Sequence, residues 1–261
     1  MGLPASLADF GPAALAAVVA AGYLVVGEPV AGAVLHRRFE GRLRTDPGAR
    51  RSLYRRLLVL EWGLTAVVAV VVSAAPDVGP AALGLQLPQH APGVVTLVAV
   101  AVVVVLVLLS TRALLSGVLV RGPQAARQPG EGRHAEPPVH ATLALLPRTT
   151  AERRLFTVVG LTAGVCEEWL YRGFLLAVVS ALSGGAPTVV LVLVAGVAFG
   201  LAHAYQGVAG VLTTGVLGAV LAALYLGTGS LLLPVVLHAL IDLRFLLVPA
   251  RVLPAGSRLA S

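Results

Sequence analysis

Seven blocks of continuous apolar sequence dominate this chain, and each is long enough to cross the hydrocarbon core of a bilayer as a helix. Such a crossing needs roughly 20 apolar residues. The blocks lie at approximately 10–35, 57–75, 93–114, 155–182, 186–204, 207–227 and 230–248. Only 12% of the 261 residues are charged, against about 25% in soluble domains. The sequence therefore predicts a polytopic membrane protein.

The apolar blocks are continuous, without the alternation of apolar and polar residues that marks the strands of a membrane barrel. Backbone groups in lipid must find partners within their own segment, which helices provide. We therefore expect an all-α transmembrane helical bundle of about seven spans, with six to eight as the acceptable range.

The arginines predict how the chain is oriented in the membrane. All 19 basic residues are Arg, and eight of them fall in the stretch 36–56. The next loop, 76–92, has none, whereas the loop 115–154 has six. Because basic loops stay in the cytoplasm, we expect a multi-pass protein of the cell membrane with its N-terminus outside and its C-terminus inside. This arrangement also explains the basic composition without a nucleic-acid partner.

A Pro/Gly-rich polar stretch within 121–150 divides the chain into two membrane parts. We expect three N-terminal spans in 1–120, a cytoplasmic linker at 121–150, a four-span bundle at 151–248 and a cytoplasmic tail at 249–261. A pair of glycines in the fifth span, Gly196 and Gly200, has the GxxxG spacing that allows close helix packing.

The last four spans contain ionisable residues at positions expected to lie in the apolar core of the bilayer, where charged groups are energetically unfavourable. A charged side chain at the bilayer centre costs about 2.5–3.5 kcal/mol on insertion scales. Intramembrane charges are therefore functional candidates. The six candidates are Glu167, Glu168, Arg172, His203, His238 and Asp242.

Helical spacing assigns different positions to the two adjacent glutamates. Glu168 and Arg172 are four residues apart, share one face and can form an ion pair. Glu167 lies about 100° further around the helix, so its carboxylate is left to point elsewhere. An unpaired carboxylate of this kind suits a general base or acid.

The same four-residue spacing recurs in two later spans. Phe199 and His203 share a face in "FGLAH", and His238 and Asp242 share one in "HALID". A carboxylate one turn from an imidazole can hold its tautomer and orientation. Counting residues along the spans places Glu167 and His238 at similar depth and His203 nearer the cytoplasmic edge.

Two further acidic residues lie in the N-terminal spans, and both are read here as structural. Glu28 precedes Pro29 within the first span, and Glu61 follows Arg56 closely enough to lie at the membrane interface.

The three motifs resemble those of the CPBP family of intramembrane proteases, also called the CAAX protease and bacteriocin-processing or Abi family. "EEWLYRG" is similar to its EExxxR motif, "FGLAH" to FxxxH, and "HALID" to its third motif, which often ends in Asn. The resemblance covers roughly 145–245. It implies a helical membrane endopeptidase with a cavity open toward the cytosol and a peptide or protein substrate.

The resemblance also implies roles for the six candidates. Glu167 and His203 would activate the attacking water, His238 and residue 242 would complete the oxyanion site, and Glu168 with Arg172 would support the geometry. Asp242 replaces the usual Asn, and an ionised carboxylate repels an oxyanion; its role therefore stays open. So does a divalent metal such as Zn²⁺, for which Glu167, His203 and His238 are the candidate ligands.

Two other functions fit a membrane protein with these residues. A membrane receptor or a bacteriocin-immunity protein would bind a peptide without cleaving it, but it would not need the complete Glu/Glu/Arg/His/His set. A proton-coupled transporter also uses buried acids and histidines, although the sequence shows no internal repeat. The oligomeric state and the substrate are not indicated; prenylated tails are not the expected substrate because the composition is typical of a bacterial, GC-rich genome.

Overall fold

A computed structural model of the chain describes residues 2–43, 45–116, 143–250 and 253. Within these residues the chain forms helices and no strands, which confirms the predicted all-α class. The first helical segment, Leu7–Arg42, has a kink at Gly11 and comprises η1 (Leu7–Ala13), α1 (Ala14–Gly22), η2 (Tyr23–Gly27) and α2 (Glu28–Arg42). It is followed by α3 (Ala49–Ser73), the short η3 (Pro80–Leu83) and α4 (Val94–Leu115).

The C-terminal segment contains the four remaining predicted spans. A single long helix is formed by α7 (Thr150–Glu168), η4 (Trp169–Leu175) and α8 (Leu176–Leu182). The next two spans are α9 (Thr188–Ala202) and α10 (Gly207–Thr228), joined by η5 (Ala204–Gln206). The last is α11 (Leu232–Leu243), which continues into η6 (Arg244–Leu247).

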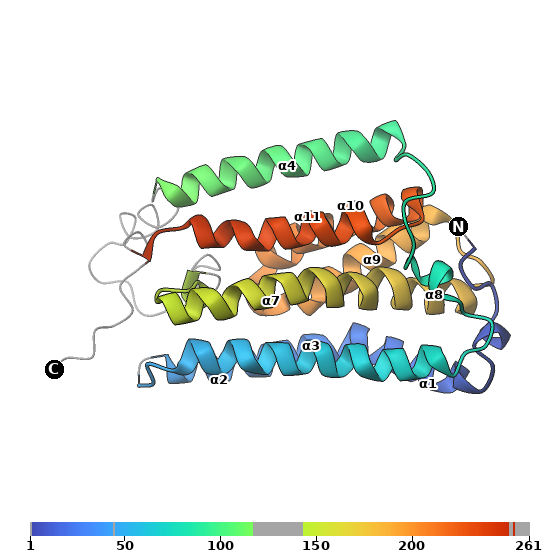
Figure 1. The fold of residues 1–261 in the computed structure, drawn as a ribbon, viewed down its shortest axis with the longest axis horizontal. Coiled ribbons are helices and arrows are strands. Elements are labelled where there is room, and N and C mark those ends of the chain that lie inside the picture. Colours follow the sequence, from blue (N-terminus) through green and yellow to red (C-terminus); the bar gives the residue numbers. More distant parts are fainter. Residues whose placement is uncertain (1, 44, 117–142, 251–252, 254–261) are drawn as a thin grey trace.

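The long helices run roughly side by side, and α7 occupies a central position among them (Figure 1). It packs against α3 on one side and α11 on the other. The partner of α9 is α10, and the contact runs through the predicted GxxxG pair: a Cβ added at Gly200 would lie 2.7 Å from the carbonyl oxygen of Val211. The close packing predicted for the fifth span is therefore present.

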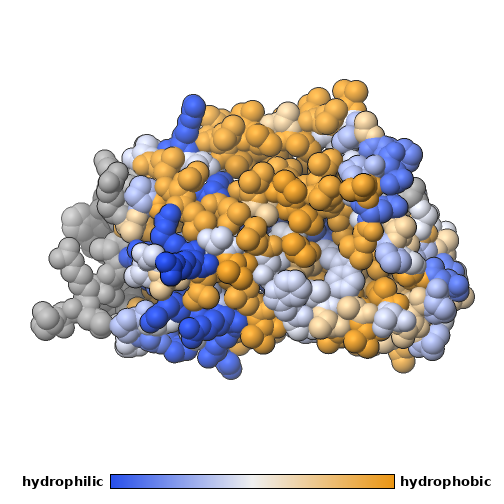
Figure 2. Space-filling view, viewed as in Figure 1, coloured by the Kyte–Doolittle hydropathy of each residue, from blue (hydrophilic) through white to orange (hydrophobic). Residues whose placement is uncertain are grey.

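A broad apolar surface covers the middle of the face shown in Figure 2, with polar residues gathered toward the two ends of the bundle. Among the described residues, four helical segments are long and apolar enough to cross a membrane, namely Leu7–Arg42, Ala49–Ser73, Val94–Leu115 and Ala204–Thr228. The helix Thr188–Ala202 is apolar but shorter. The other two predicted spans are helical at the expected positions, and together the segments form a membrane helical bundle.

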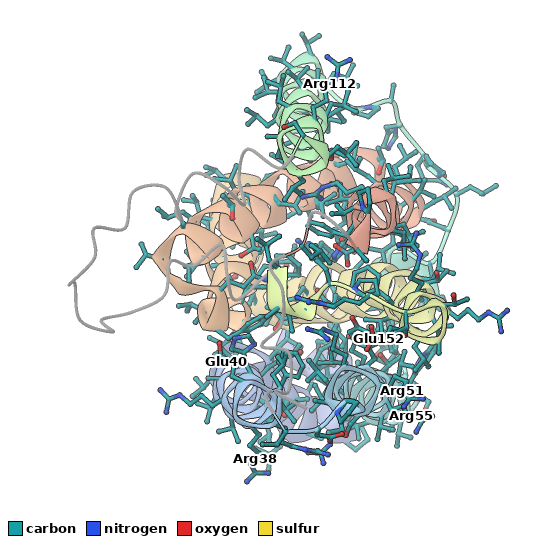
Figure 3. All side chains as sticks on the ribbon, turned by 90° about the vertical axis from the view of Figure 1, so that its left-hand side faces the viewer. Arg38, Glu40, Arg51, Arg55, Arg112 and Glu152 are labelled. Carbon is teal, nitrogen blue, oxygen red and sulfur yellow. The ribbon has the colours of Figure 1, made fainter. Side chains whose placement is uncertain are left out.

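The basic stretch 36–56, predicted as a loop, is largely helical. Helix α2 continues to Arg42 and α3 begins at Ala49, so only 43–48 connects them. Arginine is a good helix former, and its long side chain keeps the charge in water while the stem covers apolar surface. Both helices can therefore extend beyond the apolar core, and charged residues of α2, α3, α4 and α7 lie at this end of the bundle (Figure 3).

The lead-in to the first motif is also part of a helix. Thr149 caps α7 by accepting a hydrogen bond from the backbone of Glu152, whose carboxylate accepts in return from the backbone of Thr149. This capping box fixes where the helix starts. The predicted linker at 121–150 and the tail at 249–261 lie mostly outside the described residues.

Candidate active site

Glu168 and Arg172 form the ion pair that the spacing predicted. Arg172 Nη1 donates to Glu168 Oε1 at 3.0 Å, and both side chains are completely buried. The pair lies where α7 passes into η4, a segment of π-helix. Single π-turns inside α-helices are frequent at functional sites. Arg172 Nη2 also donates to the carbonyl oxygen of Gly218 on α10 at 3.2 Å, which ties the motif helix to its neighbour.

The carboxylate of Glu168 also binds His238, which the sequence did not indicate. The distance from Glu168 Oε1 to His238 Nδ1 is 2.7 Å, whereas Asp242 Oδ2 lies 3.8 Å from His238 Nε2. The orienting carboxylate is thus Glu168 rather than Asp242. The reason is tertiary: α7 and α11 pack closely enough to bring together residues that are 70 positions apart.

Glu167 points away from the ion pair, as its position on the helix predicted. Its Oε2 lies 4.0 Å from His238 Nε2, beyond hydrogen-bond distance. This buried oxygen has no hydrogen-bond partner within the described part of the chain. His238 Nε2 therefore faces two carboxylates, Glu167 and Asp242, while Glu168 occupies its other nitrogen.

Phe199 connects the second motif to the rest of the site. The guanidinium of Arg172 lies 4.2 Å from the centre of its ring, within cation–π range. The ring centres of His203 and His238 lie 4.7 and 5.7 Å from that of Phe199. The sequence placed His203 nearer the cytoplasmic edge than the other site residues. The Phe199 ring connects it to them, because this ring contacts both imidazoles.

The tautomer of His203 follows from its own hydrogen bond. Its Nδ1 lies 2.9 Å from the backbone carbonyl oxygen of Phe199, which can only accept, so Nδ1 carries a proton. In the neutral ring Nε2 is then free to accept a hydrogen bond. We assign this tautomer from the network of partners.

The N-terminal helices also contact the helix that carries the first motif. Tyr171 of η4 donates to Glu28 Oε2 at 2.8 Å and lies 3.3 Å from the carbonyl oxygen of Leu24. In a regular α-helix the Leu24 carbonyl would accept the N–H of Glu28. Here the N–H of Glu28 donates to the carbonyl oxygen of Tyr23, five residues earlier, so the Leu24 carbonyl can accept from Tyr171. Pro29 follows directly, and π-turns accommodate such interruptions of the helical ladder.

Glu61 lies inside the bundle rather than on its surface. Its residue surface is 6% exposed. Because α3 begins at Ala49, Glu61 lies more than three turns into the helix.

Two glycines that the sequence did not single out control how closely the site helices approach. A Cβ at Gly164 of α7 would lie 2.9 Å from the Cβ of Ala239 on α11. One at Gly218 of α10 would lie 2.9 Å from the Cβ of Phe199. Both contacts are shorter than side-chain carbons tolerate, so only glycine allows these approaches. A glycine in a buried helix facing another helix is the signal that could have identified them.

We expect Gly164→Val to reduce cleavage by about 100-fold, because the larger side chain separates α7 from α11 and breaks the 2.7 Å contact between Glu168 and His238. The measurement is the cleavage rate at equal amounts of folded protein. Gly63→Val is the matched control, since a Cβ at Gly63 meets nothing within 4 Å. Wild-type cleavage by Gly164→Val would contradict this account of the site.

The candidate metal ligands are not arranged as a metal site. Among the described residues, no group of three or more His, Cys, Asp or Glu side chains is placed so that it can hold a metal ion. The Nδ1 of His238 is bound by Glu168, and the Nδ1 of His203 is bound by its own helix, so each ring has only its Nε2 directed toward the site. No step below depends on a metal ion.

Three helices thus bring together acidic, basic and imidazole groups in the interior of a membrane bundle. Residues 150–244 match the model of the family described as "Type II CAAX prenyl endopeptidase Rce1-like". The match includes all three motifs and confirms the predicted resemblance to the CAAX protease family. It supports a membrane protease activity; α1–α4 lie outside it. Comparisons with the curated proteins and with the solved structures gave no significant match.

Proposed function

We propose that the protein is an intramembrane endopeptidase in which Glu167 activates a water molecule. The observation that carries the proposal is the difference between the contacts that the two glutamate side chains make. Glu168 binds both Arg172 and His238, whereas the Oε2 of Glu167 is buried, unpartnered and 4.0 Å from His238 Nε2. Polar groups separated by more than about 3.5 Å are commonly bridged by water, and here that water would be the nucleophile.

The proposed reaction begins when the water oxygen attacks the carbonyl carbon of the peptide bond and Glu167 takes its proton. His203 orients the water by accepting its other hydrogen at Nε2. The carbonyl oxygen becomes an oxyanion and accepts a hydrogen bond from Nε2 of His238 in its doubly protonated form. The carbon–nitrogen bond then breaks, and Glu167 returns its proton to the leaving amine.

Access to this site is proposed from the end of the bundle that carries the arginines. Along α11 the exposed fraction of the side chain rises from 5% at His238 to 32% at Asp242, which precedes Arg244. A peptide segment entering beside Asp242 would reach Glu167 without crossing the apolar middle of the bundle. With the basic end in the cytoplasm, cleavage would occur near the cytoplasmic face.

The substrate class we propose is a peptide or protein tail. Prenylated tails come into question only because the matched family is described as prenyl endopeptidases. An unmodified peptide remains the simpler assignment, since nothing in the geometry of the six residues requires a lipid group on the substrate.

The role of Asp242 can be tested by restoring the residue usual in the family. We expect Asp242→Asn to keep activity within about tenfold of wild type, because an amide can donate to an oxyanion that a carboxylate repels. Asp242→Ala should be about 100-fold slower than Asp242→Asn, because alanine lacks the amide donor. Cleavage rates of purified variants decide the question. Equal activity of wild type and both variants would show that Asp242 takes no part in catalysis.

The proposed activity is tested by comparing peptide termini in cells that carry wild type or Glu167→Gln at matched membrane levels. Termini that depend on Glu167 would establish proteolysis and identify the substrate. Identical termini, with both proteins stably inserted, would favour a binding or immunity protein. The double variant Glu167→Gln/His203→Ala separates the two functions further, because a protein that only binds a peptide should keep its biological effect.

A further inference from the structure

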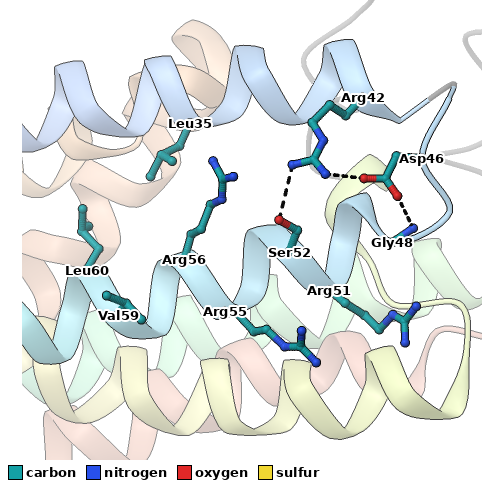
Figure 4. A pocket seen from close by; sticks show the side chains of 10 residues that line it. All are labelled: Leu35, Arg42, Asp46, Gly48, Arg51, Ser52, Arg55, Arg56, Val59 and Leu60. Atoms are coloured by element: carbon teal, nitrogen blue, oxygen red, sulfur yellow. Dashed lines mark hydrogen bonds and ion pairs between the residues drawn. The ribbon is translucent and has the colours of Figure 1, made fainter.

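A second site lies between α2 and α3 at the end of the bundle where the arginines gather. It is a cavity of about 700 Å³, open on one side. Figure 4 shows the side chains that line it. Its residues are Leu35, Arg42, Asp46, Gly48, Arg51, Ser52, Arg55, Arg56, Val59 and Leu60.

The polar part of this cavity has an excess of positive charge. Four arginines line it against a single carboxylate, that of Asp46. Asp46 forms an ion pair with Arg42, whereas Arg51, Arg55 and Arg56 have no salt bridge within the described residues. Arg56 points into the space between the two helices (Figure 4). Guanidinium groups match phosphate oxygens in charge and in geometry.

The Asp46 loop holds one wall of the cavity in place. The N–H of Gly48 donates to Asp46 Oδ1 at 2.7 Å, and Arg42 Nη1 donates to Ser52 Oγ of α3 at 3.4 Å. These contacts, the Gly48 N–H first and the Arg42 guanidinium with it, lower the pKa of the Asp46 carboxyl. Asp46 thus stays ionised and keeps Arg42 at the rim, while the other three arginines are left for a ligand.

The other end of the cavity is apolar and continuous with the surface that faces lipid. Leu35, Val59 and Leu60 line it, and Val59 is 74% exposed. Arg51 and Leu60 are nine residues apart on α3, about 14 Å along the helix axis. Trp62, two residues beyond Leu60, is half exposed, as is typical of residues at a membrane interface. A ligand that fills the cavity therefore needs an anionic head and an apolar body.

We propose that this cavity binds an anionic phospholipid, with its phosphate at Arg56, its headgroup toward Arg51 and Arg55 at the edge of the cavity, and an acyl chain along Val59 and Leu60. The lipid would bridge α2 and α3, the two helices that carry Glu28 and Glu61 to the active site. An acidic peptide would satisfy the arginines but not the apolar end, and free phosphate would leave that end without a partner. The assignment does not depend on the proposed protease activity.

The test is lipid retention by the full-length protein, measured by native mass spectrometry from nanodiscs of phosphatidylglycerol mixed with phosphatidylcholine. Wild type should retain phosphatidylglycerol in preference to phosphatidylcholine. Each basic side chain near an anionic surface strengthens binding by about fivefold. The triple variant Arg51→Gln/Arg55→Gln/Arg56→Gln should therefore lose about 100-fold in affinity for phosphatidylglycerol.

A matched control removes the same charge outside the cavity. Arg37→Gln/Arg112→Gln/Arg154→Gln changes three arginines that do not line it, and it should retain phosphatidylglycerol as wild type does. If the first triple variant does not fold, the single variants Arg55→Gln and Arg56→Gln should each lose about fivefold, and Arg37→Gln should lose nothing.

Three results would overturn the proposal. Equal losses in the two triple variants would mean that the arginines act only as a diffuse charge. Displacement of phosphatidylglycerol by millimolar inorganic phosphate would mean that the site recognises phosphate alone. Slower peptide cleavage by the cavity variant in lipid-free detergent, with normal folding, would indicate a substrate-binding surface instead.

Discussion

Glu167→Gln should abolish peptide cleavage while the protein inserts and folds normally. Glutamine has nearly the same shape as glutamate but cannot take the proton of the attacking water. The loss of a general base reduces rates by about 10²–10⁴-fold. Folding should be preserved because the Oε2 of Glu167 makes no hydrogen bond within the described residues, so that little structure depends on its charge. The cleavage rate of the purified variant in detergent, at equal protein concentration, measures the effect.

The matched control is Glu40→Gln on α2. Glu40 is exposed at the polar end and, within the described part of the chain, pairs only with His36, so this variant should cleave at the wild-type rate. Substantial cleavage by Glu167→Gln would mean that another group is the general base. By their positions, His203 and Glu61 would then be the next candidates. Loss of folded protein in Glu167→Gln would instead show that its carboxylate is structural.

Arg172→Ala should reduce the amount of folded protein as well as its activity. The guanidinium is fully buried, pairs with Glu168 and lies over Phe199. Removing one partner of a buried ion pair costs about 3–5 kcal/mol, because the other charge stays buried without compensation. We therefore expect a large drop in the thermal midpoint of the detergent-solubilised protein and in its membrane level. Arg37→Ala, at an exposed position of α2, should change stability by less than about 0.5 kcal/mol.

A double variant separates the structural role of the pair from its role in the site. Replacing a buried ion pair by apolar residues of similar volume is often neutral or stabilising. Glu168→Leu/Arg172→Met should therefore recover much of the stability that Arg172→Ala loses. It should remain inactive, because His238 Nδ1 would have lost its carboxylate partner. Restored stability together with restored cleavage would show that Glu168 does not orient His238.

Contacts within a single helix could be predicted because helical geometry fixes them. The pairing of Glu168 with Arg172, the divergence of Glu167, and the shared face of Phe199 and His203 all follow from spacings of one or four residues. The membrane class was equally accessible, since the length and composition of the apolar blocks leave few alternatives to a helical bundle.

The contacts between helices could not be predicted from such spacings. The sequence suggested Asp242 as the partner of His238 because the two share a helix, yet Glu168 of a different helix binds it at 2.7 Å. That contact depends on how closely α7 and α11 approach, which the absence of a side chain at Gly164 permits. Close packing between helices is a property of two surfaces, and neither surface is specified by one helix alone.

The sequence by itself thus determined the all-helical membrane class, the six candidate residues and the pairing within each motif, because these depend on composition and on a fixed helical repeat. Only the tertiary structure decided that Glu168 holds both Arg172 and His238, that Phe199 joins the two histidines, and that Glu61 lies in the interior. It also assembled the arginine-lined cavity between α2 and α3, because the arginines of two helices form one site only when those helices lie side by side.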